Sequence, residues 1–208
     1  MATFYTPLEQ TIHALGKNFN RIPADRKSVL KQLTGFIQWK LQQKEGIHLI
    51  FICTHNSRRS HISQIWAQAA AAYYGIQHVH SYSGGTEATA FNPRAVKAMT
   101  DAGFKITATS AGANPVYEVR FASDVEAITV FSKKYDHAVN PKSAFAAIMT
   151  CSHADVNCPV VFGMEKRITL PYNDPKDFDG TPAESQKYAE RVMEIGTEIL
   201  FAFSQVSH

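Results

Sequence analysis

The chain has 208 residues, of which 45% are hydrophobic and 19% are charged, and its formal net charge is +3. This composition excludes intrinsic disorder and allows one domain with a substantial core plus an appendage. The positive charge is small and dispersed, so it gives no reason to expect binding to nucleic acid or to an acidic membrane.

The lack of a recognisable membrane span or signal peptide and the cysteine usage both favour an intracellular location. No apolar run approaches the length of a membrane span, and residues 1–5 lack the basic and apolar regions of a signal peptide. Three cysteines are too few for a secreted disulfide framework and are odd in number, which favours thiols that react. We therefore expect a cytoplasmic protein.

The first segment carries two helical patterns. A capping box with proline at the first helical position, residues 6–9, predicts a short helix. A second, longer helix opens at residues 22–25 and closes near Gly46. We expect residues 1–45 to form a helical extension, a hairpin that packs on the domain formed by residues 46–208, rather than a partner-binding arm.

A strand, a tight loop and a helix follow directly. The apolar run 47–52 predicts a buried strand that leads into Cys53 and the pattern Cys-x5-Arg-Ser, and an alanine-rich helix is expected over 60–74. Such a loop directs backbone N–H groups at a tetrahedral oxyanion and favours a thiolate at Cys53. Arg59 can bind two oxygens of that anion with its planar guanidinium. The candidate substrate-binding residues are Thr54, His55, Asn56, Ser57, Arg58 and Arg59.

The rest of the chain alternates between strands and helices. The expected elements are a strand over 78–83, a helix over 94–102, strand-like runs over 116–121 and 126–131, a buried strand over 144–150, a short strand over 168–170, and a helix that a second capping box at 181–184 begins and that reaches about Ser204. This order predicts an α/β fold with three layers, α/β/α, around a central, mostly parallel sheet, with the N-terminal helical hairpin added.

Two cysteines follow predicted buried strands. Because ligands bind at the carboxyl ends of strands in an open α/β sheet, Cys53 and Cys151 can share one site. Cys158 lies seven positions after Cys151, so a disulfide between them requires local rearrangement and would act as a switch. The thiols of Cys151 and Cys158 could instead be inert. A zinc site with His153 lacks a fourth ligand, and we expect no metal site here.

An acidic loop over residues 173–180 is the third candidate element. The carboxylic acid of Asp174 can protonate a departing oxygen if burial and neighbouring charges adjust its pKa. The alternative is that Asp174 only caps a turn before Pro175.

These motifs together carry a family resemblance. The loop over 53–60, the segments 82–85, 92–95 and 151–159, and Asp174-Pro175 resemble the thioredoxin-coupled arsenate reductases, which are built on the low-molecular-weight protein tyrosine phosphatase fold. The resemblance runs from about Ile47 to the end of the chain. Both families share Cys-x5-Arg-Ser and a later Asp-Pro, whereas Cys-x6-Cys-Pro favours the reductase.

The resemblance implies a role for each residue. Cys53 attacks arsenate, Arg59 and the loop amides hold the arsenate oxygens, and Asp174 protonates the oxygen that leaves. Ser60 stabilises the Cys53 thiolate, and Asn56 maintains the shape of the loop. Cys151 then attacks Cys53 and expels arsenite, and Cys158 displaces Cys53, which leaves a Cys151–Cys158 disulfide for thioredoxin, the electron donor.

The sequence departs from the family pattern at several positions. His55 and Arg58 stand where such loops often have glycine and cysteine, and an inward-pointing Arg58 would strengthen oxyanion binding. Some reductases of the family hold a potassium ion near an acidic residue on the following helix; the matching position here is Gln64, and no tightly bound cofactor is expected. Lys176 and Asp177 replace the aromatic residues of the phosphatases.

Three functions from different classes stay open. The first is thioredoxin-dependent arsenate reduction. The second is hydrolysis of phosphomonoesters by a low-molecular-weight protein tyrosine phosphatase through a Cys53 phosphoenzyme. The third is a non-catalytic oxyanion-binding or redox-sensing protein.

Overall fold

Four parallel strands form the central sheet of the computed structural model, which describes residues 2–152, 154 and 160–207. The strand order is β2-β1-β6-β7, and the strands span Val79–Gly85 (β2), Ile47–Cys53 (β1), Phe145–Met149 (β6) and Met164–Thr169 (β7). The two central strands are buried almost throughout. A near-continuous apolar run is typical of a parallel strand that is covered on both faces. The three-layer α/β/α prediction is confirmed.

A second, smaller sheet is antiparallel. It contains β3 (Lys105–Ala108), β4 (Tyr117–Arg120) and β5 (Ile128–Val130), in that order. The sequence indicated β4 and β5, which pair as neighbouring strands. It did not indicate β3, because this strand is short and mostly exposed and so lacks a clear apolar alternation.

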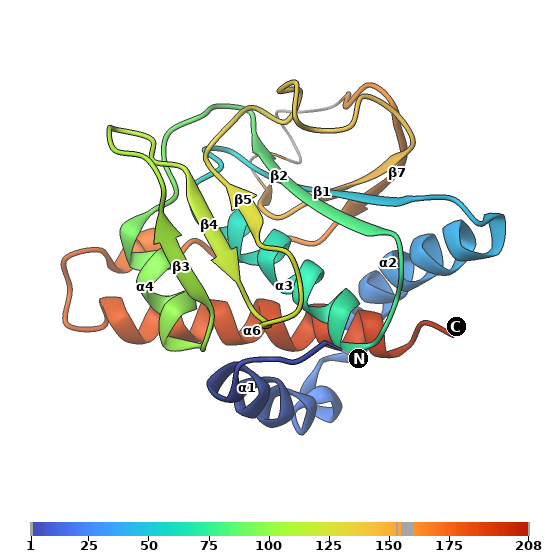
Figure 1. The fold of residues 1–208 in the computed structure, drawn as a ribbon, viewed down its shortest axis with the longest axis horizontal. Helices are drawn as coiled ribbons and strands as arrows, with labels where there is room; N and C mark the ends of the chain where they lie inside the picture. The colour runs from blue at the N-terminus through green and yellow to red at the C-terminus, as the bar shows by residue number, and fades with distance from the viewer. Residues whose placement is uncertain (1, 153, 155–159, 208) are drawn as a thin grey trace.

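Three helices lie on one side of the central sheet (Figure 1), and the first of them packs directly on β1 and β2. They are α3 (Arg59–Tyr73), α4 (Pro93–Asp101) and α6 (Glu184–Ser204). Figure 1 shows α6 crossing the width of the molecule, with α3 lying between it and the central sheet. A short 3-10 helix, η2 (Pro175–Phe178), precedes α6.

The N-terminal helices belong to the same hydrophobic core as the sheet. They are α1 (Thr6–Gly16), η1 (Phe19–Arg21) and α2 (Ala24–Gln43), and α1 lies along α6 (Figure 1). The core cluster that contains Leu49 and Phe51 of β1 includes these side chains from α1 and α2: Leu8, Ile12, Leu15, Leu30, Leu33, Phe36 and Ile37.

Both predicted capping boxes are wrong. The N-cap residue of α1 is Tyr5, one residue earlier than expected, and that of α6 is Ala183; neither makes a side-chain capping hydrogen bond. The Thr181 hydroxyl donates instead to the carbonyl oxygen of Phe178 in η2. The Thr181 hydroxyl is therefore used by the turn that precedes α6 and does not cap this helix.

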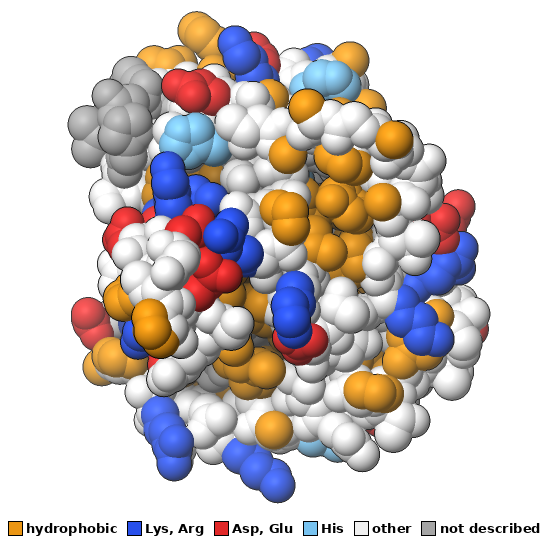
Figure 2. Space-filling view, turned by 90° about the vertical axis from the view of Figure 1, so that its left-hand side faces the viewer, with side chains coloured by type: hydrophobic (Ala, Val, Ile, Leu, Met, Phe, Trp, Pro, Cys, Tyr) orange, Lys and Arg blue, Asp and Glu red, His pale blue; other side chains and the backbone are white. Residues whose placement is uncertain are grey.

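The opposite face of the sheet carries a smaller cluster, which includes Ile50, Ile52 and both Cys53 and Cys151. Figure 2 views the molecule from the left-hand side of Figure 1, and on that side basic and acidic side chains lie beside one another. Within the described ranges, no helix is both long and apolar enough to cross a membrane.

Candidate active site

The Cys-x5-Arg-Ser loop lies at the centre of the carboxyl edge of the sheet. It connects the end of β1 with the start of α3, and β1 pairs with β2 on one side and β6 on the other. Asn56 adopts a left-handed conformation, with φ of 43°, which asparagine accepts more readily than most residues. This turn reverses the chain, so that the loop surrounds Cys53 before the helix begins.

The Cys53 sulfur lies within hydrogen-bonding distance of Ser60. Its sulfur is 3.1 Å from the Ser60 hydroxyl oxygen, and that oxygen accepts a hydrogen bond of 2.8 Å from the Asn56 side-chain amide. Because the amide donates to the Ser60 oxygen, the hydroxyl proton is left to point at the sulfur. A donated hydrogen bond and the N-terminal end of α3 both stabilise a thiolate.

Both loop arginines bind Asp174. Arg59 donates to the Asp174 carboxylate at 2.6 Å and to the Tyr172 carbonyl oxygen at 2.9 Å. Arg58 donates to the other carboxylate oxygen of Asp174 through its Nε at 2.8 Å. The Nε of Arg59 is buried and has no hydrogen-bond partner among the described residues. This unused donor is suited to an oxygen of a bound anion.

The surroundings of Asp174 decide its protonation state. Burial by itself would raise the pKa of this carboxyl group, but the charges of Arg59 and Arg58 outweigh burial and hold the pKa below its usual value. Asp174 also accepts a hydrogen bond from the Lys176 backbone at the start of η2. It is therefore ionised in the free protein, and it both caps a turn and binds the arginines.

The loop residues face different surroundings. A small depression is lined by Cys53, His55, Ser57, Arg58, Arg59 and Asp174. Two of the predicted binding residues lie elsewhere: the Thr54 hydroxyl oxygen is 3.5 Å from the sulfur of Cys151, and Asn56 is fully buried behind the loop. His55 is 3.8 Å from Glu87, at the exposed rim.

Cys151 lies beside the loop, at the end of the neighbouring strand. The parallel pairing of Ile52 with Met149 brings the carboxyl ends of β1 and β6 together. The Cys151 sulfur is buried and accepts a hydrogen bond of 3.3 Å from the backbone of Ala154. Cys53 and Cys151 are both free thiols. Cys158 and His153 lie outside the described residues.

Sequence reasoning missed the segment that supports the loop from behind. The backbone N–H of Lys133 donates to the Asn56 side chain at 2.8 Å, and the Ser132 hydroxyl donates to the His55 carbonyl oxygen at 3.1 Å. These residues follow β5, far from the loop in sequence. No local motif marks them, so only the tertiary structure identifies their role.

The N-terminal helices also reach the site, through Tyr172. The guanidinium of Arg26 in α2 lies 4.6 Å from the centre of the Tyr172 ring and forms two hydrogen bonds with Glu198. The Tyr172 carbonyl oxygen is the one that holds Arg59. An added helix therefore packs directly against the residue that positions the loop arginine.

Gln64 does not have the surroundings of a potassium site. Its amide donates to the Ser81 carbonyl oxygen, and the cavity that it lines also contains the buried ammonium of Lys133, which repels a second cation. The described part of the chain contains no group of three or more His, Cys, Asp or Glu residues arranged to hold a metal. Gln64 and its neighbours therefore do not fit a potassium ion.

Comparisons with known proteins agree with this geometry. A family model for low molecular weight phosphotyrosine protein phosphatases matches residues 48–150. An arsenate reductase of Bacillus licheniformis is 30% identical over 155 residues, which are 73% of this chain and 91% of that protein.

Solved structures show the same fold. The crystal structure of a YwlE mutant from Bacillus subtilis has a TM-score of 0.54 at 19% identity and covers 77% of this chain and 98% of its own. A low molecular weight protein tyrosine phosphatase from T. tengcongensis has a TM-score of 0.51 at 15% identity, and the match covers 77% of this chain and 100% of that protein.

Proposed function

The chain belongs to the arsenate reductase family, which is built on the low-molecular-weight phosphotyrosine phosphatase fold, and we propose that it reduces arsenate to arsenite through a covalent adduct on Cys53. It is an enzyme of this family, with arsenate reduction or phosphatase-type hydrolysis as its chemistry. The observation that carries the proposal of reduction is the second thiol: Cys151 is buried beside the loop that contains Cys53, within 3.5 Å of the Thr54 hydroxyl.

The first step exchanges one anion for another. Arsenate takes the place of the Asp174 carboxylate on Arg59 and uses the free Nε donor of that arginine. Asp174 then loses its ion pair with Arg59, the larger of the two charge effects that kept its pKa low, while its burial and the nearby arsenate both raise the pKa. Substrate binding therefore converts Asp174 from an ionised partner of arginine into a proton donor.

The covalent step follows. The Cys53 thiolate forms a sulfur–arsenic bond, the bond from arsenic to one hydroxyl group of arsenate breaks, and the departing hydroxyl takes the proton of Asp174 and leaves as water. Ser60 holds the thiolate before the attack, and Arg59 holds the remaining oxygens during it.

The redox step uses the other cysteines. The Cys151 thiolate attacks the Cys53 sulfur, and the electron pair of the sulfur–arsenic bond stays on arsenic, which is reduced from As(V) to As(III) and released as arsenite. Cys158 next attacks Cys151 in the Cys53–Cys151 disulfide and frees the Cys53 thiolate. Thioredoxin reduces the resulting Cys151–Cys158 disulfide, supplying the two electrons of the cycle.

A reducing partner needs a surface to dock on. Val160 and Phe162 follow the relay segment and are 52% and 82% exposed. Exposed apolar side chains that closely follow the proposed Cys151–Cys158 pair in the sequence are suited to contact with a protein such as thioredoxin. We propose a cytoplasmic location because this cycle depends on a thiol-reducing compartment.

Phosphatase activity is the second candidate. Cys53, Arg59 and Asp174 suffice for hydrolysis of a phosphomonoester, and these residues line one depression. In that reaction water attacks the phosphorus of the Cys53 phosphoenzyme, and neither Cys151 nor Cys158 takes part.

The test follows NADPH consumption with arsenate, thioredoxin and thioredoxin reductase, and hydrolysis of an aryl phosphate in parallel. We expect Cys151→Ser and Cys158→Ser to abolish arsenate-dependent turnover and to retain aryl phosphate hydrolysis, while Cys53→Ser loses both. Brisk hydrolysis without arsenate-dependent NADPH consumption in the wild type would sink the reductase proposal and leave the phosphatase.

A further inference from the structure

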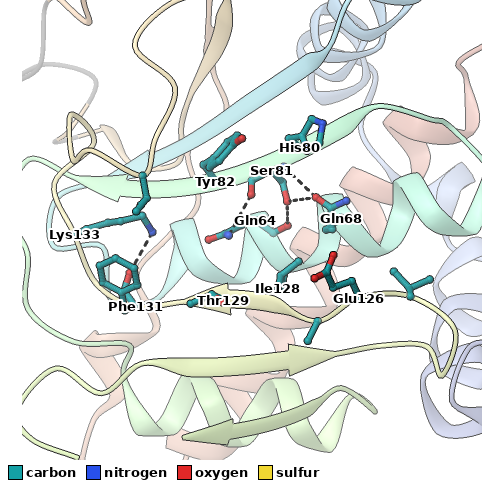
Figure 3. A pocket seen from close by; sticks show the side chains of 13 residues that line it. Gln64, Gln68, His80, Ser81, Tyr82, Glu126, Ile128, Thr129, Phe131 and Lys133 are labelled. Carbon is teal, nitrogen blue, oxygen red and sulfur yellow. Dashed lines mark hydrogen bonds between the residues drawn. The ribbon is translucent and has the colours of Figure 1, made fainter. Parts of the chain in front are cut away.

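A cavity of about 390 Å³ lies between α3, β2 and the segment over residues 125–133 (Figure 3). Gln64 and Gln68 come from α3, and His80, Ser81 and Tyr82 come from β2. The cavity shares no lining residue with the depression at Cys53. Its volume falls in the range of pockets that hold small molecules, roughly 300–1,000 Å³.

The first unusual feature is a buried cation. Lys133 is 4% exposed, and its ammonium donates one hydrogen bond of 3.3 Å to the Phe131 carbonyl oxygen and lies 4.7 Å from the Phe131 ring (Figure 3). Burial lowers the pKa of Lys133 to about 8, so the group is still mostly charged at pH 7. An ammonium has three protons to donate, and a buried charge without a counter-charge is costly.

The second feature is a buried acceptor from the opposite wall. The Gln64 side chain is 4% exposed; its Nε2 donates to the Ser81 carbonyl oxygen, which fixes the orientation of the amide. Its Oε1 has no hydrogen-bond partner among the described residues. Gln68 differs, because its Oε1 already accepts from Ser81. The cavity therefore presents a strong donor and an unused acceptor.

These groups define the chemistry of a ligand. We propose that the cavity binds a small apolar carboxylate that carries an N–H or O–H group next to the carboxylate. The carboxylate accepts from Lys133, the neighbouring N–H or O–H donates to Gln64, and the apolar body packs on Ile128, Phe131 and Val139, which line the same cavity.

Multiply charged anions fit less well. One ammonium neutralises one charge, and the Gln64 oxygen repels an anion that has no proton to donate. Glu126, which also lines the cavity, is exposed and adds a negative charge. These groups disfavour the doubly charged forms of phosphate and arsenate, and neither anion has an apolar body to pack on the cavity wall, so the proposed ligand differs from the substrate of the loop.

Titration calorimetry at pH 7 with indole-2-carboxylate tests the proposal. Its ring N–H lies beside the carboxylate, so it can satisfy both groups at once. We expect saturable binding that is about tenfold weaker for the primary amide, which lacks the charge, and weaker for the N-methyl analogue, which lacks the donor.

Variants locate the binding site. Lys133→Met should weaken binding at least about tenfold, and Gln64→Met should remove the difference between indole-2-carboxylate and its N-methyl analogue. The matched control is Lys97→Met, because Lys97 is an exposed lysine on α4. No binding to the wild type, equal binding of the carboxylate and its amide, or unchanged binding in Lys133→Met would each overturn the proposal.

Two further measurements separate this site from the proposed function. Saturating phosphate should not displace indole-2-carboxylate, and Cys53→Ser should retain the binding, whatever the arsenate assay gives. Displacement by phosphate would place the probe in the oxyanion loop and would overturn the inference.

Discussion

Asp174 holds the arginines that a substrate anion needs. Its carboxylate binds Arg58 at 2.8 Å and Arg59 at 2.6 Å, and all three side chains are largely shielded from water. Any oxyanion that enters the loop must compete with this internal carboxylate. In the proposed mechanism, the same residue therefore opposes binding in the free enzyme and supplies a proton after binding.

Asp174→Asn separates these effects. Because the amide is neutral, we expect inorganic phosphate to bind more tightly than to the wild type, by about tenfold, while turnover falls about a hundredfold because the proton donor is lost. Calorimetry with phosphate and steady-state kinetics measure the two effects. The exposed Asp177→Asn is the matched control and should change neither. Weaker phosphate binding in Asp174→Asn would contradict the competition.

Close packing joins three helices at Gly196 of α6. A Cβ atom placed there would lie 2.6 Å from the Trp66 ring of α3 and 2.9 Å from the Leu15 side chain of α1. Both neighbours are buried and belong to the core cluster. The absence of a side chain at Gly196 therefore allows α6 to contact α3 and α1 closely at one point.

Two glycine substitutions test this contact. Gly196→Ala should lower the free energy of unfolding by roughly 1–3 kcal/mol, because the added methyl group forces the Trp66 ring to move. Gly35→Ala, in the middle of α2, meets no atom within 4 Å and should raise the same free energy by up to about 1 kcal/mol. Urea denaturation measures both. Equal effects of the two substitutions would show that α6 does not pack as described.

Across the whole molecule, one hydrophobic core connects the N-terminal helices with the sheet. Side chains of α1 and α2 lie in the same buried cluster as those of β1 and α6. Arg26 extends this connection, through Tyr172, to the loop arginine. We therefore expect the chain to unfold as one cooperative unit, although its sequence suggests an extension and a catalytic domain.

The two tryptophans report on the two parts. Trp39 lies on α2 and is 42% exposed, whereas Trp66 lies on α3 and is fully buried. Trp66→Phe leaves Trp39 as the fluorescent probe, and Trp39→Phe leaves Trp66. In each variant the urea midpoint from fluorescence should coincide with that from circular dichroism. An earlier transition of Trp39 would indicate that residues 1–45 unfold independently.

The sequence by itself determined the strand, loop and helix around Cys53, because these elements are continuous in the chain and their patterns are local. The buried run before Cys53, the Cys-x5-Arg-Ser spacing and the alanine-rich helix need no distant partner to be recognised. Asp174 also came from a local Asp-Pro motif. The parallel sheet followed from the order of strands and helices.

Only the tertiary structure decided how distant groups meet. The pairing of Arg58 and Arg59 with Asp174, the support of Asn56 by Lys133, and the cavity between Lys133 and Gln64 each join residues about 70 or more positions apart. A contact between residues so far apart in the sequence leaves no periodic pattern in the chain, because it depends on how whole elements pack. The reactive residues of the loop can therefore be recognised from the local sequence, whereas the pairing of its arginines with Asp174 depends on the fold.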